Sequence, residues 1–275
     1  MPSPVSVRVR LDIIGAEVSK TVRSADGTTI AYDRVGDGPV LILAGGALSN
    51  RHGAGQLVPL LEEKFSVVAY DRRGRGESGD TPPYAPAREV EDLQALIEAV
   101  GGSAMIHGHS SGGVLALEAA AAGVPMSRLS VYEPPYLTDT TGGEESAATA
   151  RKIQQALDAG DPGTAVEVFI RGTGAPFDPA MKESPWWPAM VAVANTLPYD
   201  MALVGDSSVP TERLAKIQVP TLGLYGGSSP AWGRDSIAAV IGAIPGAVQR
   251  VVEGQTHGAA PDVLAPILIA FFDLA

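Results

Sequence analysis

The sequence predicts an α/β protein built around a largely parallel sheet, and three observations support this fold class. Apolar runs typical of strands alternate with patterns typical of helices along the chain. The 275 residues are 45% hydrophobic and 19% charged, which suits one large domain, or one domain with an insertion, around a well-buried core. No internal repeat or low-complexity tract interrupts the alternation.

The expected elements follow this alternation in order. The pair Asp26-Gly27 predicts the turn of a hairpin within residues 21–35, because it tolerates positive φ. A helix is expected over residues 89–100, where apolar residues recur every three or four positions. Apolar strands are expected at 39–46, 65–71, 103–108, 129–135, 219–227 and 247–254. Further helices are expected at 112–123 and at the C-terminal end, 261–275.

The composition argues against several function classes. A formal net charge of −11 makes neither nucleic acid nor an anionic membrane an expected partner. The absence of cysteine excludes disulfides, thiolate metal sites and a cysteine nucleophile. No sustained apolar run follows Arg8 and Arg10 to form a signal peptide, and none approaches the roughly 20 residues of a membrane span. We expect a soluble cytoplasmic protein without a metal or cofactor, since the sequence carries no signature of either.

The strand pattern lapses in one long segment. Between Tyr136 and about Arg213 the sequence is mostly helical, with Gly and Pro between the helical stretches, and strands resume at Val219. This pattern predicts a core formed by residues 1–135 and 214–275, with a helical cap, or lid, at 136–213. The alternative is that the segment is simply further core.

Residues 108–112 read Gly-His-Ser-Ser-Gly, a G-x-S-x-G motif. Such a match is weak by itself in a chain with 32 glycines, but it follows an expected strand and opens an expected helix. A nucleophilic serine needs this strand–turn–helix setting, in which the flanking glycines relieve a tight turn and the helix N-terminus favours developing negative charge. The spacing centres on Ser110, so Ser111 is not the expected nucleophile.

Together with three other segments, this motif resembles the α/β-hydrolase superfamily over nearly the whole length outside 136–213. Residues 70–79 are similar to that family's D-x-R-G-x-G-x-S segment, 219–227 to the strand before its usual acid, and 254–258 to its histidine loop. The resemblance implies a mostly parallel eight-stranded sheet with a helical lid. It also implies that 70–79 braces the fold, because no nucleotide-binding motif is present there.

His257 is the natural general base for Ser110, because it follows the last expected strand in a short loop bounded by glycines. The other histidines have weaker claims. His109, inside the motif, is expected to line the substrate pocket or to pack beside it. His107 is expected in the core and His52 in an exposed loop.

The acid that would orient His257 is displaced from its usual position. Ser229 stands where the family carries an aspartate after the seventh strand. Some members place the acid after the sixth strand instead, and Glu133 occupies that position, followed by two prolines that restrict the backbone. Glu133 is therefore the predicted acid, with Asp235, Asp206 or no acid as alternatives.

The oxyanion hole and the pocket follow from the same comparison. Gly46 and Ser111 are expected to donate backbone N–H groups, although Ala44-Gly45 replaces the family's usual His-Gly. Trp186, Trp187 and Trp232 are the only tryptophans, and they would either line an apolar substrate pocket or pack the lid.

These residues predict a serine hydrolase, with Ser110, His257 and Glu133 as a triad, that cleaves a small or medium apolar ester, thioester or lactone. Two alternatives stay open. An acyltransferase would pass the acyl group to an alcohol, amine or thiol, with an acyl carrier protein as one donor, and a non-catalytic member of the fold would only bind a small ligand. Peracid chemistry and cofactor-free cleavage of carbon–carbon bonds also stay open.

Overall fold

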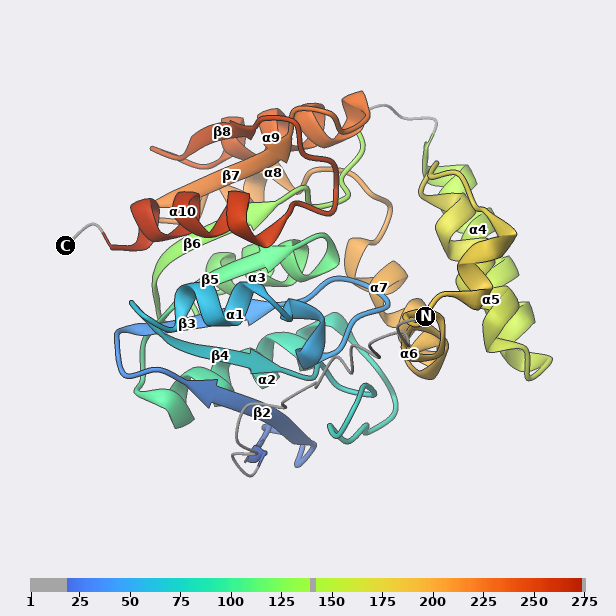
Figure 1. Ribbon diagram of the computed structural model, residues 1–275, viewed down its shortest axis with the longest axis horizontal. Helices are drawn as coiled ribbons and strands as arrows, with labels where there is room; N and C mark the ends of the chain where they lie inside the picture. The colour runs from blue at the N-terminus through green and yellow to red at the C-terminus, as the bar shows by residue number, and fades with distance from the viewer. Residues whose placement is uncertain (1–18, 139–141, 274–275) are drawn as a thin grey trace, which may run out of the picture.

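The computed structural model describes residues 19–138 and 142–273 (Figure 1). Within these residues, eight strands form one sheet in the order β1-β2-β4-β3-β5-β6-β7-β8, so the predicted fold class is confirmed. The strands are β1 (Lys20–Arg23), β2 (Thr29–Val35), β3 (Val40–Ala44), β4 (Ser66–Tyr70), β5 (Ala104–His109), β6 (Met126–Tyr132), β7 (Thr221–Gly226) and β8 (Val248–Val252).

The sheet is antiparallel at one edge and parallel elsewhere. β1 and β2 form the predicted hairpin, with Arg23 opposite Thr29, and Gly27 takes the positive φ of 84° that the turn requires. β2 pairs antiparallel with β4, and all the pairings from β4 through β3 to β8 are parallel. The segments that follow β3 to β8 therefore leave the sheet at a common edge.

Helices cover both faces of the sheet. The α-helices outside the insertion are α1 (Leu57–Leu61), α2 (Pro86–Val100), α3 (Ser111–Ala121), α8 (Thr211–Leu214), α9 (Ala231–Ala243) and α10 (Pro261–Phe272). Successive side chains of a strand point to opposite faces. Leu41 and Leu43 of β3 pack with α1 and α10, whereas Ile42 and Ala44 pack with α2, α3 and α9.

Between β6 and α8, the chain forms α4 (Gly142–Asp158), α5 (Pro162–Gly172), α6 (Trp187–Ala192) and α7 (Leu197–Val204), which we call the insertion helices. Short 3₁₀ turns η2 (Pro179–Glu183) and η3 (Ala194–Thr196) join them, and η1 (Arg51–Ala54) follows β3. Figure 1 shows α4 and α5 standing apart from the sheet, with α6 and α7 nearer to it. The insertion helices have a hydrophobic cluster of their own, built around Ile153, Val166 and Leu197. The boundaries 136–213 of a cap remain a prediction.

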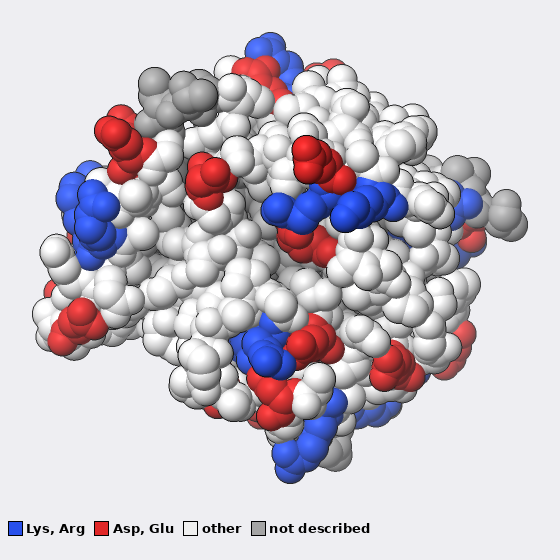
Figure 2. All heavy atoms as spheres, turned by 180° about the vertical axis from the view of Figure 1, so that it is seen from behind, with Lys and Arg blue, Asp and Glu red and all other residues white. Residues whose placement is uncertain are grey.

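Charged residues are dispersed on the face opposite that of Figure 1. Figure 2 shows Lys and Arg there in small groups beside Asp and Glu, rather than in one continuous basic field. In the part of the chain that the structure describes, no helix combines the length and the apolar character that crossing a membrane demands. The charged surface in this view gives no extended complement to a polyanion.

Candidate active site

Ser110 lies in a strained turn between β5 and α3. Its backbone has φ 55° and ψ −126°, a conformation that a residue with a Cβ rarely adopts, and it is the N-cap residue of α3. The Ser110 N–H donates to Tyr132 O at 2.9 Å, which ties the turn to the end of β6. The predicted nucleophile therefore stands at the positive end of a helix, held in a sharp bend.

The glycines around Ser110 are required by close packing of the backbone. A Cβ on Gly108 would lie 2.5 Å from Gly112 O, and a Cβ on Gly112 would lie 2.2 Å from Ala44 O. Both distances are shorter than real Cβ contacts, so a larger residue would force the strand, the helix or the loop after β3 to move. The G-x-S-x-G spacing is thus explained by sterics.

His257, in the loop after β8, contacts Glu133. The His257 Nδ1–H donates to Glu133 Oε2 at 2.7 Å, which leaves Nε2 free to accept a proton. Glu133 is fully buried, whereas the His257 side chain is 38% exposed, so the imidazole faces the accessible side of the pair. The structure brings together these two residues, the predicted base and the predicted acid.

Glu133 follows β6 directly, and its backbone takes a positive φ of 43°. The predicted strand over 129–135 therefore ends at Tyr132, because this conformation turns the chain out of the sheet. The carboxylate also accepts from Gly226 N–H at 2.8 Å. Burial alone would raise the pKa of Glu133, but hydrogen bonds from His257 and Gly226 outweigh it and hold the pKa below its ordinary value.

Ser229, at the family's usual acid position, lies behind this carboxylate. Its hydroxyl also lowers the pKa of Glu133. Among the described residues, however, it has no partner at ordinary hydrogen-bond geometry. Gly233 of α9 packs against the same carboxylate, since a Cβ there would lie 2.8 Å from Glu133 Cδ. The space that an aspartate side chain at 229 would need is close to that filled by Glu133.

The histidine loop is fixed to the end of the sheet by two backbone contacts. Tyr132 Oη donates to Thr256 O at 2.6 Å, and His109 Nε2–H donates to His257 O at 2.7 Å. Burial and the neighbouring His257 lower the pKa of His109 to about 4, so this ring is neutral near pH 7. The His109 and Trp232 rings flank His257, with centroids 4.7 Å and 5.3 Å from its ring.

Gly46 lies directly against the turn that holds Ser110. A Cβ on Gly46 would lie 2.8 Å from Ser110 Cβ and 3.1 Å from His109 O, so only glycine fits there. Ser111 is the first residue of α3, where N–H groups lack a partner within the helix. The two predicted oxyanion donors thus lie on either side of Ser110, one in the loop after β3 and one at the start of α3.

Within residues 19–138 and 142–273, no hydrogen bond joins Ser110 Oγ to His257 Nε2. Catalytic hydrogen bonds are often long before a substrate binds. The proximity of the two residues rests on His109, which precedes Ser110 and packs on the His257 ring.

Several sequence candidates lie elsewhere. Asp235 is partly exposed and pairs with Arg234, and Asp206 is exposed and accepts from Ser208. Neither carboxylate contacts His257 among the described residues, where Glu133 fills that place. His107 is buried with its Nδ1 3.3 Å from Ser130 Oγ, and His52 is exposed, as both were predicted to be.

The tryptophans divide into two groups. Trp232 contacts the His257 ring, but Trp186 is 73% exposed and Trp187 packs edge-on against Phe177 within the insertion. Of the two predicted alternatives, Trp187 packs within the insertion cluster, and only Trp232 lies beside the predicted base. Adjacent tryptophans on a short helix point in different directions, which explains the divergence.

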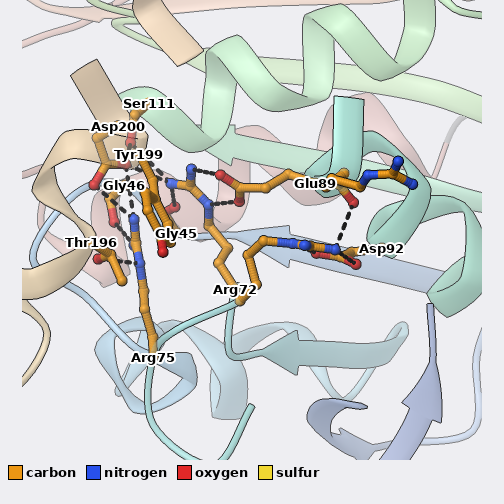
Figure 3. A network of polar contacts seen from close by, with 12 residues as sticks. Gly45, Gly46, Arg72, Arg75, Glu89, Asp92, Ser111, Thr196, Tyr199 and Asp200 are labelled. Atoms are coloured by element: carbon orange, nitrogen blue, oxygen red, sulfur yellow. Dashed lines mark hydrogen bonds and ion pairs between the residues drawn. The ribbon is translucent and has the colours of Figure 1, made fainter. Parts of the chain in front are cut away.

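Sequence reasoning missed a buried ionic network behind the predicted oxyanion hole (Figure 3). Arg72 and Arg75, from the segment after β4, contact Glu89 of α2 and Asp200 of α7. The segment 70–79, which contains both arginines, was expected to brace the fold. No local sequence signal identifies Asp200 as their partner. These four side chains are almost fully buried.

Comparisons with known proteins identify the family of the chain. The sequence profile described as the alpha/beta hydrolase family matches residues 40–267, most of the chain, so the chain belongs to that family. A solved structure of an alpha/beta hydrolase from Sphaerobacter thermophilus is 47% identical, with a TM-score of 0.85, over 92% of this chain and 100% of that chain.

Two curated relatives add names of activities. A non-heme chloroperoxidase from Streptomyces lividans is 28% identical over 91% of this chain and 98% of its own length. A bifunctional esterase/perhydrolase from Acinetobacter calcoaceticus is 28% identical over 74% of this chain and 80% of its own length. The family and these relatives support an enzyme with hydrolase activity.

Proposed function

We propose that the chain is a serine hydrolase that cleaves small or medium apolar esters, thioesters or lactones through an acyl-enzyme on Ser110. The observation that carries the proposal is the 2.7 Å contact between His257 and buried Glu133, beside the strained turn of Ser110. A buried carboxylate on Nδ1 selects the tautomer whose Nε2 is a base, and it stabilises the imidazolium formed during reaction.

In the first half of the reaction, Ser110 Oγ bonds to the substrate carbonyl carbon while its proton moves to His257 Nε2. The carbonyl oxygen becomes an oxyanion, which the N–H groups of Gly46 and Ser111 stabilise. The carbon–oxygen or carbon–sulfur bond to the leaving group then breaks, and the leaving group takes the proton from His257. One such N–H donor contributes about 3–4 kcal/mol to transition-state stabilisation in a related site.

In the second half, water attacks the acyl-enzyme. His257 takes a proton from the water, the oxyanion forms again in the same hole, and the bond to Ser110 Oγ breaks. Ser110 recovers its proton from His257, and the carboxylic acid is released. No step needs a group beyond these residues and water.

The apolar character of the proposed substrate rests on the surroundings of His257. Trp232 and the neutral His109 ring flank the imidazole, and neither offers a charge to a substrate. The nearby arginines Arg72 and Arg75 are paired with Glu89 and Asp200, so they are not free to bind an anion. A neutral acyl group fits this environment better than an anionic one.

Two measurements test the proposal. A fluorophosphonate probe should add to Ser110 Oγ with loss of fluoride, which intact-mass and peptide analysis would detect. The S110A variant should show neither labelling nor hydrolysis of p-nitrophenyl acetate or butyrate. Folded wild-type protein that is not labelled, or S110A protein that hydrolyses the esters at the wild-type rate, would contradict the proposal.

A second candidate differs only in the acceptor of the acyl group. The relative named a bifunctional esterase/perhydrolase favours hydrogen peroxide, which would attack the acyl-enzyme in place of water and release a peracid. Acyl transfer to an alcohol, amine or thiol uses the same first half. Product analysis with each acceptor separates these outcomes, and tight binding of a small ligand without labelling would favour the non-catalytic alternative.

A further inference from the structure

A buried cluster joins the insertion helices to the predicted oxyanion hole. It consists of Arg72, Arg75, Glu89, Ser111 and Asp200, all no more than 3% exposed (Figure 3). Arg72 donates from Nε and Nη2 to the two carboxylate oxygens of Glu89, at 2.5 Å and 2.8 Å. Arg75 Nη2 donates to both Asp200 carboxylate oxygens at 2.8 Å.

The cluster is electrically balanced, with two guanidinium groups against two carboxylates. A buried ion pair is weak evidence for added stability, because the cost of removing both charges from water offsets their attraction. A balanced cluster is also no receptor for an anionic ligand. Its distinctive property lies in the backbone groups that its arginines hold.

The arginines bind the carbonyl groups on both sides of Gly46 Cα. Arg75 Nη1 donates to Gly46 O at 2.7 Å, and Arg72 Nη1 makes a longer contact of 3.4 Å to Gly45 O. The Gly45–Gly46 peptide is trans, so Gly45 C=O and Gly46 N–H point in opposite directions. Holding the carbonyl from behind therefore directs the N–H away from the cluster.

The second predicted donor is held by the same carboxylate. Ser111 Oγ donates to Asp200 Oδ1 at 2.7 Å and accepts from Arg72 Nη1 at 3.1 Å. Asp200 Oδ1 thus receives Ser111, Arg72 and Arg75 together. Asp200 Oδ1, on the insertion helix α7, is therefore linked to both predicted donors. It contacts Ser111 directly, and it is connected to the Gly46 peptide through the arginines.

The geometry points to Asp200 as a positioning residue for the predicted oxyanion hole. Through Arg72, Arg75 and the Ser111 side chain, it holds the backbone N–H groups of Gly46 and Ser111 where both can donate to the oxyanion. Formation of the oxyanion hole is then coupled to the seating of α7 on the core. This inference rests on the proposed hydrolase function, because the hole has a role only if an oxyanion forms.

The test compares D200N and S111A with wild type. D200N keeps the size and shape of the side chain but replaces the charged acceptor of both arginines with a neutral amide. S111A removes the hydroxyl contact to Asp200 and keeps the backbone N–H. The control is Y199F, on the same helix. It removes the contact of Tyr199 Oη to Asp80 at 2.7 Å, which also joins the insertion to the core but includes no member of the cluster. Tyr84 still stacks on residue 199 in this variant.

The readouts are kcat and KM for a p-nitrophenyl ester, and both the rate and the endpoint of fluorophosphonate labelling at Ser110. We expect kcat and the labelling rate to fall together, by about 10²-fold in D200N and about 10-fold in S111A, since loss of one whole donor costs about 10²–10³ in kcat. KM should stay within about threefold, and labelling should still reach completion. Y199F should stay within about twofold on every kinetic measure.

Folded D200N and S111A proteins that label at the wild-type rate would overturn the inference. It is also overturned if the endpoint falls with the folded fraction while the rate per active molecule is unchanged, because that is a structural effect only. If D200N does not fold, S111A alone decides by the same criteria. Absence of Ser110 labelling in folded wild type removes the hydrolase proposal itself, which distinguishes the two failures.

Discussion

Gly233 offers a sharp test of the proposed acid. It limits the position of the Glu133 carboxylate but has no side chain that could take part in the reaction. A Cβ at 233 would lie 2.8 Å from both Glu133 Cδ and Oε1 and 3.2 Å from Oε2. Real Cβ atoms essentially never approach closer than 3.0 Å, so in G233A the carboxylate must move by several tenths of an ångström. It has little freedom to do so, since Oε2 accepts from His257 and Oε1 from Gly226.

The expected result of G233A is a fall in kcat of about 10-fold to 10²-fold, since misplacing a group by about 1 Å costs about 10²-fold and the displacement here is several tenths of an ångström. Complete loss of the acid sets an upper limit of about 10⁴-fold. Gly242, on the exposed side of the same helix, provides the control because a Cβ there meets nothing within 4 Å. G242A should keep wild-type kcat and gain about 0.5–1 kcal/mol of unfolding free energy from helix propensity.

The assay is steady-state hydrolysis of a p-nitrophenyl ester, with thermal unfolding of both variants as the check on folding. A folded G233A protein that hydrolyses the ester as fast as G242A would contradict the proposed role of Glu133. Such a result would mean either that the carboxylate relaxes without losing His257 or that Glu133 does not orient the base.

The remaining predictions concern the acid itself and a buried histidine. E133Q should lower kcat by up to about 10⁴-fold while the protein stays folded, because a neutral amide neither stabilises the imidazolium nor selects the tautomer. D235N is the matched control and should leave kcat unchanged. The opposite pattern would transfer the role to Asp235. For His107, burial lowers the pKa from 6.5 to about 3, so the unfolded chain binds a proton that the folded protein excludes, and stability falls as pH drops below about 6.5. Between pH 7 and pH 5 this group should remove roughly 2 kcal/mol from the unfolding free energy, and urea titrations of H107Q should show a pH dependence smaller by that amount, whereas an equal dependence would rule out the assignment.

The alternation of apolar strands and helices was enough to predict the fold, because parallel strands covered on both faces carry a strong and regular signal. Candidate site residues could be named where a residue type is tied to a place in strand order, as at Ser110, His257 and Glu133, and their catalytic roles stay predictions. The positive φ of Glu133, just after β6, was not predicted, because no local sequence signature indicates it.

Contacts between distant segments limited what the sequence could predict. Arg72 and Asp200 are 128 positions apart, and nothing near either residue identifies the other as its partner. The tryptophans illustrate the same limit, because a residue type suited to a pocket does not determine its direction. Trp186 is largely exposed, while Trp232 contacts His257.

The junction at Asp200 also constrains the exchange of parts between relatives. Replacing the segment from α4 to α7 with that of another family member is an obvious route to new specificity, but it would remove one of the two carboxylates that balance Arg72 and Arg75 in the recipient scaffold. An uncompensated buried charge typically costs 3–5 kcal/mol. A chimera therefore needs an acidic residue transplanted to position 200, or an apolar replacement for Arg75 that leaves the Arg72–Glu89 pair intact, before its new segment can be judged on substrate preference.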